Sequence, residues 1–117
     1  MIGRIWRGNT RADQASEYLA YIEKTGLKEY RATPGNRGVW ILRKVEGGAA
    51  EFLVIWFWED FDAIRRFAGP EPQKAVYYPE DDRFLLGKEP NVTHYEVAAG
   101  GDAPVASAPP RRREATA

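Results

Sequence analysis

The first residues of the chain show the hydrophobic pattern of a strand followed by a helix. Residues 2–7 alternate between apolar and polar positions, which predicts a β-strand. Thr10 followed by Asp13 resembles a capping box and predicts that a helix starts there. Apolar residues then recur at helical spacing as far as Gly26, which predicts the C-terminal end of that helix.

Two β-rich segments follow, and their spacing indicates a hairpin. Residues 38–45 and 51–58 are joined around Gly47-Gly48, a typical tight-turn sequence. Asp60 stands where it can cap a second helix, and Gly69-Pro70 predicts that helix's end.

The remainder of the folded part predicts short turns and one more strand. Residues 72–86 indicate short helical turns broken at Pro79, and residues 91–97 form the last predicted strand. The resulting order is βαββαβ, which is typical of an α+β fold of the ferredoxin-like kind. We therefore expect one antiparallel sheet with both helices on one face.

The two hairpin strands are apolar on both faces. Residues 52–58 contain no polar side chain except the tryptophan indoles, and residues 39–42 are also apolar throughout. A half-solvated antiparallel strand instead alternates apolar with polar residues. The uncovered sheet face would expose an apolar patch of roughly several hundred Å². At roughly 25 cal/mol per Å², leaving it exposed to solvent costs on the order of 10 kcal/mol of stability. We expect a homodimer that packs sheet against sheet, in preference to a cover supplied by the C-terminal segment.

Composition excludes several classes of function. Of the 117 residues 44% are hydrophobic, and 17 basic residues balance 17 acidic ones. A formal charge of zero gives no general attraction to nucleic acid or to an acidic membrane. The sequence has no cysteine, which excludes disulfides and a cysteine nucleophile. We find no signal peptide and no apolar run long enough to cross a bilayer, so we expect a cytoplasmic protein.

The composition changes near the C-terminus. After Val97 the sequence is rich in Ala, Gly, Pro and Ser and ends in the basic stretch Arg111–Glu114. Such a segment buries too little apolar surface to offset the entropy of ordering it. We expect one folded domain over residues 1–97 and a disordered tail over 98–117, solvated rather than bound to a phosphate-rich partner.

Several of these features together resemble a known family. The βαββαβ order, the doubly apolar hairpin, Trp58-Glu59-Asp60 leading into a helix and the closing strand His94–Val97 resemble the antibiotic biosynthesis monooxygenase family, a branch of the dimeric α+β barrel superfamily. The resemblance covers residues 1–97. It implies a pocket between helices and sheet in each subunit, while the dimer closes the other face. Activities in that family include cofactor-independent oxygenation of hydroxylated aromatics and haem degradation.

The strongest candidates for catalysis lie on the first and last strands. His94 is the only histidine of the chain, and histidine alone has an unperturbed pKa near neutrality. It is a candidate general base, with a structural role at the sheet edge as the open alternative. Arg4 is expected to meet it and to hold a carboxylate or enolate oxygen, with a surface salt bridge to Glu96 or Glu51 as the open alternative. Arg7 is expected to pair with Glu96 or Glu51 at the surface instead.

A tyrosine pair follows the second predicted helix. Tyr77 and Tyr78 are candidates to cover the pocket and donate a hydrogen bond to a substrate oxygen, since loops held by a rigid scaffold often carry function. The alternative is that both rings fill core space. We interpret the carboxylates of residues 80–82 as the start of a helical turn.

The remaining candidates are aromatic walls for a planar ligand. Trp40, Trp58 and Phe67 are predicted to contact substrate, although the sequence does not give the face on which each tryptophan lies. One histidine and scattered carboxylates indicate no metal site, and no glycine-rich fingerprint indicates a dinucleotide.

Three functions remain open from the sequence. The first is a small cofactor-independent monooxygenase that acts on a hydroxylated aromatic or similar apolar small molecule, with His94, Arg4 and a tyrosine as its catalytic groups. The second is a non-catalytic module that binds a small molecule or serves as a dimeric accessory subunit. The third is haem degradation, which we disfavour because the second predicted helix has no histidine to ligate iron.

Overall fold

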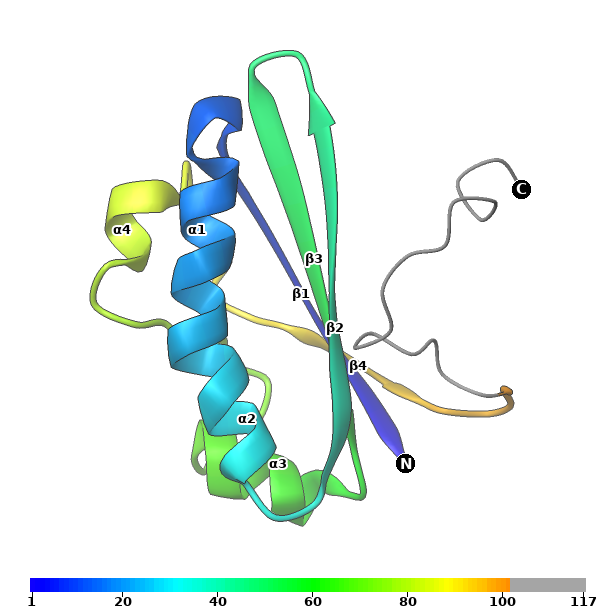
Figure 1. Cartoon of the computed structure of the whole chain (residues 1–117). Coiled ribbons are helices and arrows are strands. Elements are labelled where there is room, and N and C mark those ends of the chain that lie inside the picture. Colours follow the sequence, from blue (N-terminus) through cyan, green and yellow to red (C-terminus); the bar gives the residue numbers. More distant parts are fainter. Residues whose placement is uncertain (102–117) are drawn as a thin grey trace.

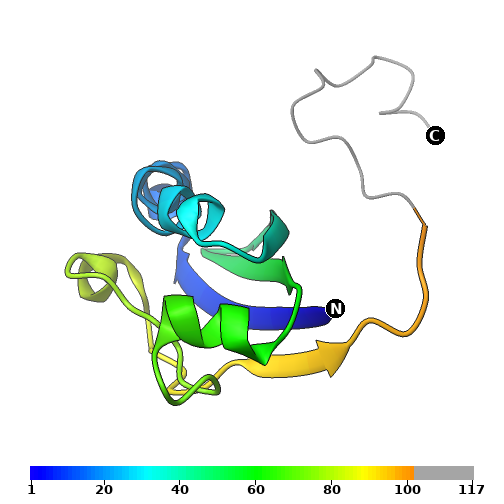
Figure 2. The ribbon, with the colours of Figure 1, turned by 90° about the horizontal axis from the view of Figure 1, so that it is seen from below.

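Four antiparallel strands form the sheet that the sequence predicted. They pair in the order β2-β3-β1-β4, and the helices lie on one side of the sheet (Figures 1 and 2). This computed structural model describes residues 1–101, so most of the tail predicted over residues 98–117 lies outside the described residues. The strands are β1 (Ile2–Arg11), β2 (Asn36–Glu46), β3 (Ala49–Trp58) and β4 (Thr93–Glu96).

Helices connect β1 to β2 and β3 to β4, and a tight turn joins β2 to β3. The predicted βαββαβ order and the ferredoxin-like arrangement are therefore confirmed. None of the helices within residues 1–101 is long and apolar enough to cross a membrane. The helical segments are a 3-10 turn (Ala12–Gln14), α1 (Ala15–Ile22), a π-helical turn (Glu23–Leu27), α2 (Lys28–Ala32), α3 (Phe61–Ala68) and α4 (Asp81–Phe84).

Local signals correctly predicted the hairpin and the start of α3. Gly47 adopts a left-handed φ of 60° in the turn between β2 and β3, a conformation that glycine enters without steric cost. The Asp60 carboxylate accepts a hydrogen bond from the Ala63 backbone N–H at 2.8 Å, which satisfies one of the free donors at the N-terminus of α3. Gly69, with a φ of 92°, follows the last residue of α3.

Both predicted ends of the first helix are wrong. Thr10 lies within β1 and its hydroxyl donates to the Arg11 carbonyl, so it does not cap a helix. The helical segment then passes through Gly26 and ends at Ala32. Gly26 therefore does not stop the helix. It makes room for the Tyr30 ring instead, because an added Cβ would lie 2.6 Å from the Tyr30 hydroxyl.

The two faces of the sheet differ in what covers them. On β3 every second side chain from Ala50 to Trp58 is buried under the helices, whereas the alternate ones are half-buried. No helix of residues 1–101 lies on the open face (Figure 2). Its half near the β2–β3 turn is polar, with Arg7, Asn9, Lys44 and Glu51, whereas the other half is apolar as the sequence predicted. The register brings together on this face Ile5, Trp40, Leu42, Leu53, Ile55 and Phe57.

Candidate functional site

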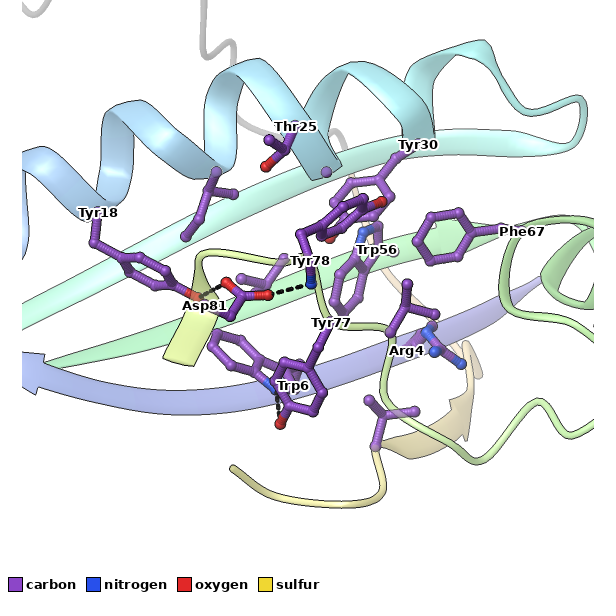
Figure 3. Close-up of a pocket in the computed structure, with 15 residues that line it drawn as sticks. Arg4, Trp6, Tyr18, Thr25, Tyr30, Trp56, Phe67, Tyr77, Tyr78 and Asp81 are labelled. Carbon is purple, nitrogen blue, oxygen red and sulfur yellow. Dashed lines mark hydrogen bonds between the residues drawn. The ribbon is translucent and has the colours of Figure 1, made fainter. Parts of the chain in front are cut away.

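A cavity lies between the helices and the sheet, and we call it the helix-side pocket (Figure 3). Its floor is formed by β1 and β3, one wall by α1, the π-helical turn and α2, and the remainder by residues 76–81 with Phe67 and Val92. In this conformation the cavity measures about 30 Å³, room for about two water molecules. A ring-sized ligand therefore requires side chains of the wall to move.

Arg4 is the buried cation of this pocket. It lies on β1 opposite His94 of β4, and its side chain is 1% exposed. The guanidinium donates to the carbonyls of Pro72 and Lys74 and lies near the face of Trp56. Burial lowers the pKa of Arg4 to about 10, which leaves it charged at neutral pH. No carboxylate of residues 1–101 forms an ion pair with it.

Two residues that line the pocket each carry a buried N–H donor that makes no hydrogen bond of normal geometry within residues 1–101. The donors are Nε of Arg4 and the indole Nε1 of Trp56. The Trp56 indole lies close enough to the Tyr30 hydroxyl to affect its pKa, but no hydrogen bond of normal geometry satisfies Nε1. Buried donors without partners cost about 1–3 kcal/mol each. Asn36 and Trp58 carry similar donors outside the pocket, whereas a ligand with acceptor atoms in this cavity would satisfy both Arg4 and Trp56.

His94 meets Arg4, as the sequence predicted, but does not line the pocket. Its Nε2 lies 3.0 Å from Nη1 of Arg4, and Phe61 packs edge-on against its ring. Because the guanidinium has only donors, Nε2 is the acceptor and the imidazole is neutral. Burial and the Arg4 charge lower the pKa of His94 to about 4. This histidine orients Arg4 and is a weak base at neutral pH.

Tyr77 and Tyr78 both line the pocket, but their hydroxyls already have protein partners. The Tyr77 hydroxyl accepts from the Trp6 indole at 3.0 Å and donates to the Glu89 carbonyl. The Tyr78 hydroxyl donates to the Glu29 carboxylate at 2.9 Å. Burial raises the pKa of both tyrosines, so both are neutral at physiological pH.

The three predicted aromatic walls lie in different places. Phe67 lines the pocket, and Trp58 is buried behind it with the two rings stacked at 5.7 Å. Trp40 lies on the open face opposite Ile55, so the structure does not bring it to the pocket. Arg7 is near Glu51 at the surface, with Nη1 and Oε2 3.9 Å apart, as predicted.

Asp81 is the pocket residue that the sequence reasoning missed. It belongs to the acidic residues 80–82, which were correctly predicted to start a helical turn, since α4 begins at Asp81. Its burial was not predicted: Asp81 is 5% exposed and lines the pocket. Its carboxylate accepts from the Tyr18 hydroxyl at 3.1 Å and from the Tyr78 backbone N–H at 2.6 Å (Figure 3). Burial raises the pKa of Asp81 above its ordinary value. The sequence did not predict this contact, because Tyr18 on α1 is 63 residues away from Asp81.

Comparison with known proteins identifies the fold. No protein-family model matches the sequence, and no curated protein matches it. Among solved structures, a putative antibiotic biosynthesis monooxygenase from Bacillus cereus has a TM-score of 0.56 at 18% identity, covering 87% of this chain and 96% of that one. The haem degrader MhuD from Mycobacterium tuberculosis, with two haems in its active site, has a TM-score of 0.55 at 19% identity, covering 87% and 100%. An MhuD variant with manganese protoporphyrin IX bound has a TM-score of 0.56 at 19% identity, covering 88% and 100%.

These similarities identify the fold: the chain has the α+β fold of antibiotic biosynthesis monooxygenase-type proteins. The resemblance predicted from the sequence is thereby confirmed for the fold, and the low identities extend it no further.

The side chains present do not fit haem ligation, although two of the similar structures carry a porphyrin. The only histidine of the chain uses Nε2 to accept from Arg4. Within residues 1–101 no cluster of three or more His, Asp and Glu side chains is arranged to hold a metal ion.

Proposed function

We propose that the chain is a monooxygenase-like protein whose helix-side pocket binds a hydroxylated aromatic molecule as its anion. The observation that carries the proposal is the pair of unsatisfied donors, Arg4 Nε and Trp56 Nε1, on a buried cation and its neighbouring indole. An anionic oxygen supplies both a counter-charge and a hydrogen-bond acceptor. Such charge-assisted hydrogen bonds are about twice as strong as neutral ones.

The rest of the pocket suits a planar ring. Aromatic faces of Trp6, Tyr30 and Phe67 line it, and such walls favour flat ligands. A ring enters when the segment of Val76, Tyr77 and Tyr78 moves outward, which breaks the hydrogen bonds of both tyrosine hydroxyls and part of their packing against the core. Closing it again excludes water and strengthens the interaction with Arg4.

The proposed reaction is oxygenation by O₂ without a bound cofactor. For an anthrone-type substrate the ring methylene becomes a carbonyl: one oxygen atom of O₂ enters the product and the other leaves as water with the two methylene hydrogens. The electrons come from the deprotonated substrate, so the protein supplies a cation beside the developing anion and a dry site. The similar fold of a putative antibiotic biosynthesis monooxygenase supports this choice.

The proposed unit is a homodimer of the domain of residues 1–97, and its proposed location is cytoplasmic. The open sheet face supports the homodimer, because Trp40, Ile55 and Phe57 are only half-buried in one subunit. A contiguous apolar patch of several hundred Å² is rare on monomers. Stable partners bury about 800 Å² each, so the proposal requires the open face to bury an area of that order.

A non-catalytic small-molecule-binding or accessory module is the second candidate. The observation in its favour is that His94 is a weak base and the hydroxyls of Tyr77 and Tyr78 are already bonded. Such a protein binds the same anionic ligand and releases it unchanged.

Oxygen uptake in the presence of anthrone separates the two candidates. We expect the parent protein to consume one O₂ per anthraquinone formed, and the Arg4→Met variant to lose this activity while Arg7→Met keeps it. Binding of the ligand without oxygen uptake supports the module instead. Failure of the parent to bind para-nitrophenolate or anthrone contradicts both candidates.

A further inference from the structure

Asp81 places a second buried charge in the helix-side pocket. Burial of a carboxylate is costly unless a cation or several hydrogen bonds offset it. Asp81 has two donors, the Tyr18 hydroxyl on α1 and the Tyr78 backbone N–H, and its side chain lines the cavity. Neither donor carries a charge, so no cationic hydrogen-bond partner offsets the burial of this carboxylate.

The cations near Asp81 are engaged with other carboxylates. Lys88 forms an ion pair with Asp82 at 2.8 Å, and Arg83 pairs with Glu17 and Glu80. Within residues 1–101 no ion pair joins Asp81 to Arg4, although both line the same cavity.

The positions of Arg4 and Asp81 suggest that a ligand connects them. In Figure 3 they lie on either side of the segment of Tyr77 and Tyr78. Two opposite buried charges that served stability alone would gain most by direct contact, because removing each from water is costly. Held apart in one cavity, they match a conjugated aromatic ligand whose acidic hydroxyl faces Asp81 and whose ring carries the resulting negative charge to a second oxygen facing Arg4.

We propose that Asp81 is the proton acceptor that converts the bound hydroxyaromatic into its anion. The step breaks the O–H bond of the ligand and forms an O–H bond on the Asp81 carboxyl, while the negative charge moves to the ligand and faces Arg4. No oxidant takes part. This inference rests on the proposed function and identifies the preferred ligand class as aromatics with an acidic hydroxyl.

Other groups of the pocket are less suited to this role. The His94 Nε2 accepts from Arg4, and its pKa of about 4 makes it a weak base. Tyr18, Tyr30 and Tyr78 have raised pKa values and are neutral donors. Asp81 has the opposite property, because burial raises its pKa toward the range in which a carboxylate is an effective base.

Several groups face Asp81 and influence its titration. Burial is the main cause of its raised pKa, and Asp82 adds to it. The hydrogen bonds from the Tyr78 backbone and from Tyr18 act in the other direction, as does Lys88. Removing the Tyr18 hydroxyl should therefore raise the pKa of Asp81 further.

The proton inventory of ligand binding tests the proposal directly. Para-nitrophenol is titrated into the full-length protein at a pH below the probe's own pKa, in buffers of different ionisation enthalpy, while absorbance reports phenolate. We expect the parent to bind phenolate and release no proton, because the proton stays on Asp81. In Asp81→Asn, phenolate binding releases about one proton, or the probe binds as the neutral phenol. Glu23→Gln, which alters an exposed carboxylate outside the pocket, should behave like the parent.

A second pair of variants covers the possibility that Asp81→Asn does not fold. Tyr18→Phe leaves the carboxyl in place, and we expect the acid edge of phenolate binding to move to higher pH. Tyr21→Phe is the control, because that hydroxyl accepts from the Glu80 N–H and makes no hydrogen bond with Asp81. Release of one proton by the parent, or an unchanged acid edge in Tyr18→Phe, overturns the proposal. Absence of probe binding by the parent contradicts the proposed function itself.

Discussion

Gly26 offers a prediction in which two local effects have opposite signs. It lies within the π-helical turn between α1 and α2, where glycine costs about 1 kcal/mol relative to alanine by helix propensity. By that measure Gly26→Ala is stabilising. The structure predicts the reverse, because an added Cβ lies 2.6 Å from the Tyr30 hydroxyl oxygen and 2.9 Å from its Cζ.

The cost follows from how tightly Tyr30 is held. Its ring is 6% exposed and packs edge-to-face against Trp56 at 4.9 Å and Phe67 at 4.7 Å. Relieving the overlap requires the ring to shift among buried aromatics, and overpacking of that kind costs about 1–3 kcal/mol. Subtracting the propensity gain of about 1 kcal/mol leaves a net destabilisation of about 1 kcal/mol.

Urea denaturation of Gly26→Ala measures this difference in the free energy of unfolding. Gly48→Ala is the matched control, because an added Cβ at Gly48 has no neighbour within 4 Å. We expect Gly26→Ala also to weaken ligand binding, since Gly26 and Tyr30 line the pocket. A Gly26→Ala protein more stable than the parent would refute the reasoning.

Three further substitutions test separate parts of the account. Ile55→Lys places a charge at the centre of the open face and should convert the dimer to a monomer in sedimentation, whereas the edge change Glu46→Lys should not; a monomeric parent contradicts the interface. His94→Gln tests pH dependence: the folded-state pKa of about 4 lies below the ordinary 6.5, so the unfolded state binds the proton first and stability falls as pH drops from 6.5 toward 4. After allowance for solvent screening, the parent loses about 1–2 kcal/mol of stability over this pH range. In urea titrations at neutral and acidic pH, His94→Gln should lose less stability than the parent. An equal loss in both proteins speaks against the lowered pKa of His94. Asp60→Ala removes the cap of α3 and should cost about 1 kcal/mol in thermal or urea unfolding, with exposed Asp62→Ala as the comparison; no change would mean the cap bond is not made in solution.

Much of the fold was predictable because the signals were local. The Gly47-Gly48 turn, the Asp60 cap and the apolar hairpin each act over a few residues, and the structure confirms them. The end of the first helix was not predictable in this way. Gly26 looks like a stop in the sequence, but tertiary packing against Tyr30 decides its role.

The site was less predictable because it depends on register and long-range contacts. The meeting of Arg4 and His94 followed from strand order alone. The faces of the tryptophans required the hairpin register, which puts Trp40 opposite Ile55 on the open face. The burial of Asp81 depends on α1 and could not be read from the acidic run around it.

The affinity of the pocket for a phenolate tests the central claim most directly. Trp56→Phe removes an unsatisfied N–H donor from the pocket, and Trp58→Phe removes an equally unsatisfied donor outside it. A hydrogen bond to a charged group is worth about 1.5–3 kcal/mol, so we expect para-nitrophenolate to bind Trp56→Phe roughly ten- to a hundredfold more weakly than the parent, with Trp58→Phe close to the parent. Equal affinities of the two variants would contradict the account, because the donors in the pocket would then contact no ligand anion.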